Sequence, residues 1–356
     1  MSAASLVLSG LGLITTVGYS VEESCAALRC GMTRPHPLDG MTAWDLGAEQ
    51  EVPLVGHPIT GLMDGFQGVG RWFRLSRYAL LDLLRYSRLD AADAPFWRQC
   101  GLIACLPELD PDRFAFPEED ARALPQRLLR AVGLPIPALN VSCIEAGSLG
   151  PLLALQQARE KLASGTWHRA LILSLDSLVD ASSLRWLKTS RRLKTPEHPT
   201  GLMAGEAGAC LLVESPRQAG ERGDAWVEEC AVANSRGEEL PAIQRGQTLS
   251  RVIHEALAGV GGVGDILGNH NGEVTRAMAW GTARLGLPTK ALLEHHRETW
   301  PAVSLGDVGT ASPLVAICMA ARAFTRRYAR GDAALVWNLS DDGAAGACVV
   351  RRKSAR

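Results

Sequence analysis

The chain has 356 residues, of which 47% are hydrophobic and 21% charged, and its formal net charge is −1. This composition is typical of an ordinary globular protein, and the balanced charge gives no global electrostatic basis for binding nucleic acid or an anionic membrane. The nine cysteines are odd in number and lack a Cys-x-x-Cys pair, which indicates free thiols rather than a disulfide framework. The opening segment lacks the basic start of a signal peptide, and no apolar run is long enough to span a membrane. We therefore expect a cytoplasmic protein.

Apolar spacing and turn residues predict alternating strands and helices along the chain. The predicted strands cover 6–15, 101–106, 138–144, 226–233 and 265–268, and the predicted helices cover 21–30, 75–84 and 249–258. Ser76 is a candidate N-cap of the second helix. Residues 34–72 are rich in Pro and Gly and are expected to cross the surface as a long excursion, whereas residues 107–122 are expected to form an acidic loop or lid. The pattern favours stacked α/β layers with a mixed sheet in each half.

The chain contains an internal repeat. Residues 147–158 read Gly-Ser-Leu-Gly-Pro-Leu-Leu-Ala-Leu-Gln-Gln-Ala, and residues 309–320 read Gly-Thr-Ala-Ser-Pro-Leu-Val-Ala-Ile-Cys-Met-Ala. Each copy is a small-residue turn followed by a Pro that suits the first position of an apolar helix. A buried-strand pattern follows each copy, and then the tetrapeptide Ala-Gly-Ala-Cys. The strand patterns lie at 170–175 and 334–339, and the tetrapeptides at 207–210 and 345–348.

This repeat predicts a duplicated α/β unit in which the two turns meet at a pseudo-two-fold axis, a natural place for a site. A helix N-terminus at each turn would favour a developing negative charge. The polar stretch 214–224 is the expected join between the halves. We therefore expect one half at 1–216, with a candidate nucleophile turn at 145–150, and the other at 224–356.

Several segments resemble the β-ketoacyl synthase branch of the thiolase superfamily. The best matches are residues 165–177 and 201–214, the latter similar to the family's Gly-Phe-x-x-Gly-Glu-Ala-Ala segment. Residues 9–15 are similar to its first strand and turn, 306–312 to its Gly-His-Thr-Gly-Ala-Ala loop, and 340–347 to its C-terminal Gly-rich loop. These segments occur in the family's order and span almost the whole chain. The resemblance implies a thiolase-like five-layered αβαβα fold made of two duplicated halves, and an obligate dimer.

The same resemblance places the nucleophile position on Ser148. The family's nucleophile is a Cys at the tip of a strand, where the N-terminus of the next helix stabilises the thiolate. Counting back from Gly165, which matches the family's Gly at the end of that helix, the position falls on Ser148. Cys143 is the alternative nucleophile. It lies inside the predicted strand, however, and a buried core thiol is its simpler interpretation.

Two further family positions are also altered. His270 can fill the role of the first catalytic His, although the loop after it does not match. The family's Lys becomes Ala302, and its second His becomes Asp307. Decarboxylative condensation needs a thiolate and neutral or positive donors that hold an enolate. Because a carboxylate at Asp307 opposes that charge, we do not expect ordinary condensing activity.

Two functions from different classes follow. In the first, the protein is a non-catalytic partner subunit or adaptor in a homodimer, or in a heterodimer with a ketosynthase-like subunit. Its ligands would be an acyl carrier protein or CoA thioester. Degenerate ketosynthase-like chains also resemble accessory proteins of bacterial toxin-secretion systems, so a secreted effector is another partner that the resemblance allows.

In the second function, the protein is an acyltransferase that does not condense. Ser148, His270 and Asp307 would supply a nucleophile, a base and an orienting acid. Backbone N–H groups in three loops would form the oxyanion hole, and these loops are marked by Gly147, Gly306 and Gly343.

Each candidate also has a purely structural interpretation. Ser148 is suited to cap a helix, His270 lies in a turn-forming cluster, and Asp307 can bond to its own Gly-rich loop. Glu206, in the Gly-Glu-Ala segment, is interpreted as structural rather than as an acid catalyst. The spacing of His, Cys and acidic residues predicts neither a metal nor a cofactor site.

Overall fold

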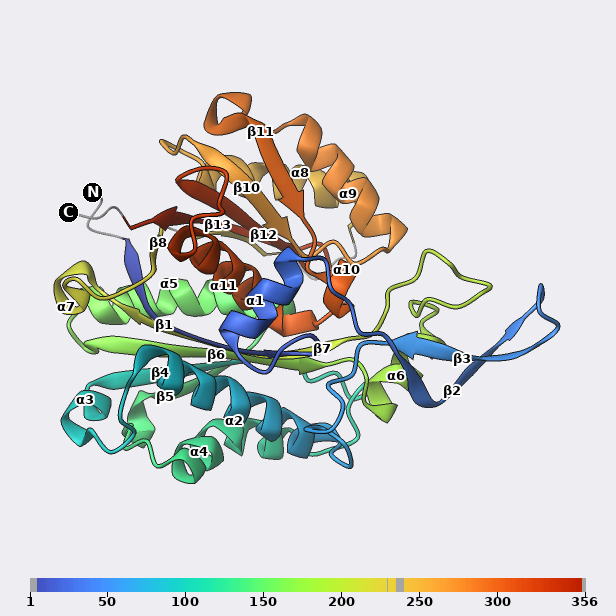
Figure 1. The fold of residues 1–356 in the computed structure, drawn as a ribbon, viewed down its shortest axis with the longest axis horizontal. Coiled ribbons are helices and arrows are strands. Elements are labelled where there is room, and N and C mark those ends of the chain that lie inside the picture. Colours follow the sequence, from blue (N-terminus) through green and yellow to red (C-terminus); the bar gives the residue numbers. More distant parts are fainter. Residues whose placement is uncertain (1–4, 229, 235–239, 354–356) are drawn as a thin grey trace.

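Helices and strands are stacked in five layers (Figure 1). The computed structural model describes residues 5–228, 230–234 and 240–353; residues 1 and 356 of the predicted halves and residue 229 of the predicted strand at 226–233 lie outside these ranges. Helices α2, α3 and α4 cover one sheet, helices α1, α5 and α11 lie between the sheets, and α8 and α9 cover the second sheet. This arrangement confirms the expected thiolase-like αβαβα fold.

The elements follow one another in nearly the same order in each half. The first half contains β1 (Leu6–Thr15), α1 (Val21–Arg29), β2 (His36–Asp45), β3 (Gln50–Gly56), α2 (Gly68–Ser87), α3 (Ala94–Arg98), β4 (Cys100–Leu106), α4 (Glu118–Val132), η1 (Ala138–Asn140), β5 (Val141–Glu145), η2 (Gly147–Leu149), α5 (Gly150–Ala163), β6 (Arg169–Ser177), α6 (Ala181–Thr189), β7 (Glu206–Glu214) and α7 (Pro216–Ala219). The second half contains β8 (Ala225–Val227), β9 (Ala231–Ala233), α8 (Ala242–Ala256), β10 (Val263–Gly268), α9 (Val274–Leu285), η3 (Thr289–Ala291), β11 (Leu292–Thr299), α10 (Ala302–Leu305), η4 (Gly309–Ala311), α11 (Ser312–Thr325), β12 (Ala333–Leu339) and β13 (Ala345–Arg352).

The strand order shows the duplication directly. The first half runs β1-β7-β6-β4-β5 and the second half runs β8-β13-β12-β10-β11. The directions also match, because β4, β5 and β6 are mutually parallel, as are β10, β11 and β12, whereas β7 and β13 run antiparallel to their neighbours. Strand β8 pairs with both β13 and β1, so the sheets that we expected to be separate share one hydrogen-bonded path.

The central layer is the most apolar part of the core. Residues of α11 are buried on all sides of the helix, including Leu314, Ile317 and Phe324. Helix α5 contributes Leu152 and Leu155 to the same cluster. A helix that is apolar all round is stable only when it is covered on every side, and the two sheets provide that cover. Among the helices that the structure describes, none has the length and apolarity needed to cross a membrane.

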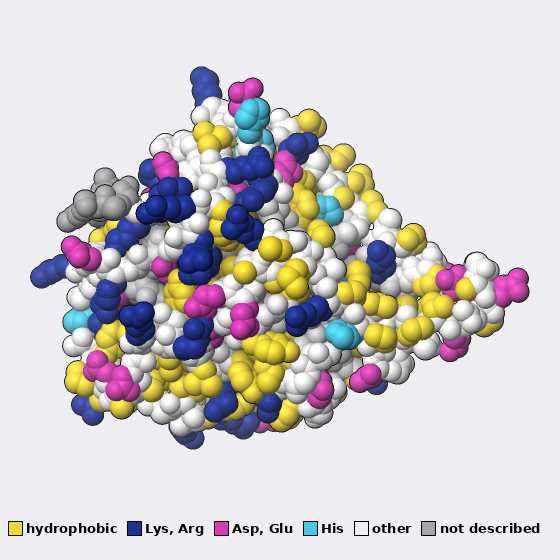
Figure 2. All heavy atoms as spheres, in the orientation of Figure 1, with side chains coloured by type: hydrophobic (Ala, Val, Ile, Leu, Met, Phe, Trp, Pro, Cys, Tyr) yellow, Lys and Arg dark blue, Asp and Glu magenta, His cyan; other side chains and the backbone are white. Residues whose placement is uncertain are grey.

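The excursion expected at 34–72 is more regular than the sequence indicated. Strands β2 and β3 form a hairpin that projects from the body of the molecule (Figures 1 and 2). Its base packs on α6 through Leu38 and Leu54. Farther out, Trp44 is 49% and Leu46 is 72% exposed. Pro and Gly within a strand are tolerated in such a two-stranded ribbon because both strands are edges.

Helix α2 begins at Gly68, seven residues before the expected start, and Ser76 does not cap it. Ser76 lies within the helix, and its hydroxyl donates to the carbonyl of Trp72 at 2.8 Å. The first two turns of α2 were not predicted because this segment contains glycines, which disfavour a helix in isolation. Burial of Trp72, which is fully inaccessible to solvent, overrides that preference.

Candidate functional site

The two repeated turns meet in the central layer, as the repeat predicted. Turns η2 and η4 contact each other, and each leads into a central helix that has a Pro in its first turn. Gly147 and Gly309 open the two turns with φ angles of +48° and +50°. This left-handed conformation carries little penalty for Gly. The N-termini of α5 and α11 therefore lie beside each other.

The turn at Thr310 is occupied by a carboxylate of the chain itself. Asp176, at the end of β6, accepts hydrogen bonds from the Thr310 N–H at 3.1 Å and from its hydroxyl at 3.2 Å. Arg113 donates to the other oxygen of the same carboxylate at 2.5 Å. An anion at a helix N-terminus is favourable. In this half of the pseudo-symmetric site, the Asp176 carboxylate therefore occupies the place at the helix N-terminus where an external anion would bind.

The turn at Ser148 has no such carboxylate. Ser148 is half-buried, and its hydroxyl makes no hydrogen bond with any other described residue. Its backbone carbonyl accepts a hydrogen bond from the Asn338 side chain at 2.7 Å. A Ser hydroxyl becomes a good nucleophile only beside a base. The structure gives Ser148 no such partner.

The other two predicted catalytic residues have separate partners. In a Ser-His-acid triad the His Nδ1–H donates to the acid. Here the Gly272 N–H donates to Nδ1 of His270 at 3.2 Å, so this nitrogen is an acceptor. The Asp307 carboxylate accepts from the Gly309 N–H at 2.8 Å and from the Asn271 side chain at 2.6 Å. Across the described parts of the chain, no hydrogen bond joins the three predicted catalytic residues.

His270 is held as a neutral ring. Burial lowers its pKa, and the nearby Arg276 lowers it further. The ring packs at 5.8 Å from the ring of Trp300. A neutral imidazole at neutral pH would be available to a ligand, but it adds no positive charge to the site.

Cys143 faces away from the two turns. It packs in the cluster between the first sheet and its outer helices, whereas the next residue along β5, Ile144, packs toward the central layer. The Cys143 thiol donates to the Arg122 carbonyl at 3.8 Å. Burial raises the pKa of Cys143 to about 11, and Glu145 contributes to the increase. The thiol is therefore protonated at neutral pH.

Two of the three expected oxyanion loops use the N–H of their Gly internally. Gly306 donates to the Ala302 carbonyl at 2.9 Å, and Gly343 donates to the Ser340 carbonyl at 3.2 Å. A Cβ at Gly306 would come within 2.7 Å of the Met203 carbonyl, so this Gly permits a close backbone approach. The close packing accounts for Gly at this position.

Carboxylates gather beside the Ser148 turn. The Glu108 carboxylate lies 3.5 Å from the point that a Cβ on Gly147 would occupy. Burial raises the pKa of Glu108, and the carboxylates of Asp342 and Asp341 raise it further. Burial is the main cause, and the neighbouring carboxylates add to it, so negative charge lies beside the turn and disfavours the formation of an enolate or thiolate there.

Arginines near these carboxylates form a compact ion-pair network. The Arg192 guanidinium pairs with Glu273 at 2.8 and 2.9 Å and with Asp341 at 2.6 and 3.0 Å. Arg276 binds Asp341 at 2.6 Å. Burial would raise the pKa of Asp341, but Arg276 and Arg192 together hold it below its usual value. Within the described residues, no group of His, Cys, Asp and Glu side chains is placed to hold a metal ion.

Glu206 forms a buried ion pair away from the turns. Its carboxylate binds Arg71 through two 2.6 Å contacts, the Ile59 N–H at 2.7 Å and the Ser177 hydroxyl at 2.9 Å. Both carboxylate oxygens are therefore satisfied within the fold. These contacts support the structural interpretation of the Gly-Glu segment.

His57 couples the stability of this region to pH. Its N–H donates to the Ala204 carbonyl at 2.7 Å, and its buried Nδ1 has no hydrogen-bond partner among the described residues. Burial, with a contribution from His36, lowers its pKa to about 4. In the unfolded chain His57 has a pKa near 6.5. Between pH 6.5 and pH 4 it therefore binds a proton in the unfolded state but not in the folded state. Stability is therefore lost as pH falls from about 6.5 toward 4.

We expect this single group to remove about 2 kcal/mol of unfolding free energy between pH 7.5 and pH 5. Urea unfolding at both pH values measures the loss, and His57→Gln, which cannot titrate in this range, serves as the control. The variant should show a smaller loss than the wild type. An equal loss in both proteins would assign the pH dependence to other groups.

The residues that hold these turns from a distance were not predicted from the sequence. Asp176 and Asn338 reach turns that lie more than a hundred positions away in the sequence. Asn338 lies within the repeated strand pattern at 334–339, so the repeat contained a signal for it. Asp176 and Glu108 had no such signal, because only the folded chain brings them to the turns.

Comparisons with solved structures identify the same fold. A type II PKS ketosynthase in complex with its acyl-carrier protein is similar to this chain with a TM-score of 0.75 and 16% identity, covering 99% of this chain and 100% of that one. The ketosynthase from module 6 of the bacillaene synthase of Bacillus subtilis 168 has a TM-score of 0.76 and 10% identity, covering 99% and 72%. The ishigamide ketosynthase/chain length factor has a TM-score of 0.71 and 19% identity, covering 98% and 100%. No protein-family model and no curated protein sequence matches the chain. The chain has the thiolase-like fold of ketosynthases.

Proposed function

We propose that this ketosynthase-like protein has lost decarboxylative condensation and acts as a partner subunit or adaptor within a thiolase-fold dimer. In this proposal Ser148 occupies the position of the nucleophilic Cys, and Asp307 occupies that of the second His. The ligands are acyl groups on an acyl carrier protein or on CoA. The partner is a second copy of this chain or a ketosynthase-like subunit.

The observation that carries the proposal is the dispersal of the catalytic groups. The Ser148 hydroxyl has no base as a partner among the residues that the structure describes, and Nδ1 of His270 accepts a backbone N–H. Both oxygens of Asp307 are bonded to Asn271 and Gly309. His270 and Asp307 are therefore held by contacts outside a triad, and Ser148 lacks the partner that would activate it.

Electrostatics support the same conclusion. Condensation builds negative charge on an enolate, and preorganised donors must hold that charge. The site instead presents Glu108, whose raised pKa reflects its burial and the neighbouring Asp341 and Asp342. The nearby Arg192 and Arg276 are engaged with carboxylates of the chain. An enolate would therefore form in an unfavourable potential.

The neighbours in fold support the choice of ligand and partner. One of them is a ketosynthase in complex with an acyl-carrier protein, and another is a ketosynthase/chain length factor. Both are similar to this chain over nearly its full length. A secreted effector remains a further partner class within the proposal, and pull-down with tagged protein under matched salt would identify it.

A condensation assay tests the loss of activity. With malonyl- and acyl-carrier protein as substrates, the wild type should form no β-ketoacyl product. Ser148→Cys alone should remain inactive, because Asp307 and the surrounding carboxylates persist. Product formation by the wild type would contradict the proposal. Ser148→Cys combined with Asp307→His is the informative comparison, because it restores two of the altered residue types.

We also propose that the dimer forms across β5. The described sheet ends at β5 on one side and at β11 on the other. Strand β11 has charged or His side chains at 294–298, which protect an edge from pairing. Strand β5 is uncharged from Val141 to Ile144 and half-buried throughout. It is therefore the edge that suits a second copy.

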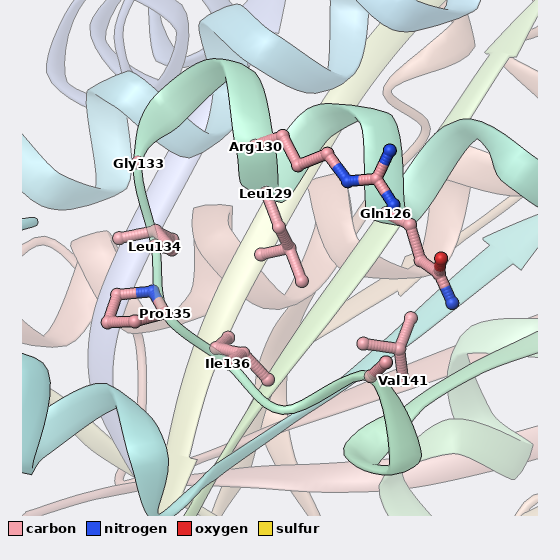
Figure 3. A pocket seen from close by; sticks show the side chains of 9 residues that line it. Gln126, Leu129, Arg130, Gly133, Leu134, Pro135, Ile136 and Val141 are labelled. Atoms are coloured by element: carbon pink, nitrogen blue, oxygen red, sulfur yellow. The ribbon is translucent and has the colours of Figure 1, made fainter.

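A cavity beside β5 supplies a place for the partner (Figure 3). Its volume is about 210 Å³, and its lining includes Leu129, Leu134, Ile136 and Val141. Leu139, in η1 two residues before β5, is 90% exposed. In an isologous dimer the same patch meets itself, so each Leu139 would lie against this patch of the other copy.

Leu139→Glu should convert the dimer into a monomer, because it would place a charge against a patch whose lining is mostly apolar, with Gln126 and Arg130 as its polar side chains. Light scattering after size-exclusion chromatography measures the mass. Leu285→Glu is the matched control, since Leu285 is 91% exposed on α9 and far from β5 in sequence. It should leave the mass unchanged. A dimeric Leu139→Glu protein would contradict this interface.

A further inference from the structure

Each half of the molecule contacts the turn of the other half through a buried side chain at an equivalent position. Asn338, near the end of β12, donates from its amide to the Ser148 carbonyl at 2.7 Å. Ser174, near the end of β6, donates from its hydroxyl to the Thr310 carbonyl, also at 2.7 Å. In both cases the donor belongs to one half and the acceptor to the other.

The internal repeat shows that these two contacts are equivalent. Aligning the turns at 147–158 and 309–320 places Ser148 on Thr310, and aligning the strands at 170–175 and 334–339 places Ser174 on Asn338. The two hydrogen bonds therefore start from equivalent positions of the two strands and end on equivalent backbone carbonyls of the two turns. A reciprocal contact kept in both copies, although the donor residue type differs, points to a requirement for a donor at this place.

Asn338 is retained there at an energetic cost. The residue is fully buried, and its Oδ1 has no hydrogen-bond partner among the described residues. A buried unsatisfied acceptor is unfavourable. Within the described parts of the chain, only the amide N–H of this side chain makes a hydrogen bond, which it donates to the Ser148 carbonyl.

We infer that Asn338 is a positioning residue that sets the orientation of the Ser148 turn at the start of α5. This inference rests on the proposed function, because the turn that Asn338 orients carries Ser148, which that proposal places at the position of the nucleophilic Cys. Fixing the Ser148 carbonyl also fixes the direction of the side chain and of the N–H groups that follow it. The site would lose its geometry without Asn338 even though the fold remains.

The two turns differ in how much they depend on this contact. Thr310 is held a second time by Asp176, which binds both its N–H and its hydroxyl. The residue equivalent to Asp176 in the second half is Ser340, which bonds within its own loop to Asp342 and Ala344. Loss of Asn338 should therefore loosen the Ser148 turn more than loss of Ser174 loosens its counterpart.

A thiol reporter tests this inference. Ser148→Cys is introduced together with Cys143→Ala, and the pKa of the new thiol is read from the pH profile of its alkylation by iodoacetamide, followed by peptide mass spectrometry. A helix N-terminus lowers the pKa of a thiol that it holds, whereas the carboxylates near Glu108 raise it. The variants compared below leave those carboxylates unchanged, so a difference in thiol pKa between them reports the position of the turn. The reporter needs neither a partner nor an acyl ligand, so it reads the geometry even if the proposed function is wrong.

Adding Asn338→Ala should raise the thiol pKa by about 0.5 unit or more, equivalent to a roughly threefold loss of thiolate at fixed pH well below the pKa. Adding Ser174→Ala, the matched control, should raise it by less than half as much. Asn338→Ser keeps a donor with a shorter reach, and it should give a smaller rise than Asn338→Ala. It also supplies a second variant if the alanine protein does not fold.

Thermal unfolding separates positioning from general destabilisation. Both alanine variants lose one buried hydrogen bond and should melt at similarly reduced temperatures. Asn338→Ala should nevertheless raise the thiol pKa more than twice as far as Ser174→Ala does. Equal pKa shifts in the Asn338 and Ser174 variants, or no shift in any Asn338 variant, would overturn the inference.

Discussion

Glu206→Ala should lower the unfolding free energy by about 3–5 kcal/mol, because it leaves Arg71 buried without a counter-charge. The Arg71 side chain is 8% exposed and that of Glu206 is fully buried. The guanidinium would retain the carbonyls of Met63 and Phe66 as partners at 3.0 Å, but these carry no full charge. Urea unfolding at one fixed protein concentration measures the loss.

Asp120→Ala is the control for this prediction. Asp120 pairs with Arg127 at 2.9 Å, but both side chains are about half exposed. Exposed pairs contribute about 0–1 kcal/mol, so this variant should unfold almost like the wild type. If Glu206→Ala also cost less than about 1 kcal/mol, the buried pair would not be the structural element that we describe.

Gly205→Ala should also strongly lower the unfolding free energy, because the fold leaves no space for the added methyl group. A Cβ at Gly205 would lie 2.0 Å from the Leu305 carbonyl oxygen and 3.2 Å from that of Asp307. The Gly205 N–H donates to the same Asp307 carbonyl at 2.9 Å, which holds the two segments together. We expect a loss of about 3 kcal/mol, at the upper end of the usual range for overpacking, measured by urea unfolding.

Gly281→Ala is the matched comparison. Gly281 lies within α9, and a Cβ there would meet nothing within 4 Å. Alanine should stabilise the exposed helix by about 0.5–1 kcal/mol. A lower unfolding free energy for Gly205→Ala together with a higher one for Gly281→Ala would support the described packing at Gly205. A neutral Gly205→Ala would show that the segments separate easily and that the Asp307 loop is not fixed by this contact.

The repeat carried most of the information about the fold. The turns at 147–158 and 309–320 were predicted because small residues, a Pro and an apolar helix follow one another locally in each copy. The strands at 170–175 and 334–339 were predicted because buried parallel strands are continuously apolar. Local patterns of this kind survive in one sequence, and the structure confirms them as η2–α5, η4–α11, β6 and β12.

Elements that depend on distant packing were harder to predict. The start of α2 was missed because Gly68 and Gly70 weaken the local helical signal, and the burial of Trp72 is visible only in the fold. The β2–β3 hairpin was missed because Pro and Gly interrupt both strands. In both cases a contact from another element outweighs the preference of the segment itself.

The site was predictable as a place but not as a set of contacts. The resemblance to the family predicted Ser148, His270 and Asp307 as site residues, and the repeat indicated that the two turns meet. The partners of these residues come from other loops. Asn271 holds Asp307, and Asn338 holds the Ser148 turn. No spacing in the sequence shows which of several polar groups a carboxylate will bind.

The intact mass of the protein after incubation with acyl-CoA and acyl-carrier-protein thioesters tests the central claim most directly. Our account predicts a folded protein with no covalent acyl adduct, because the Ser148 hydroxyl has no base beside it. An added acyl mass that disappears in Ser148→Ala and forms slowly in His270→Ala would contradict the account and establish acyl transfer. An adduct that survives Ser148→Ala but disappears in Cys143→Ala would place the nucleophile in β5 and contradict it in a different way.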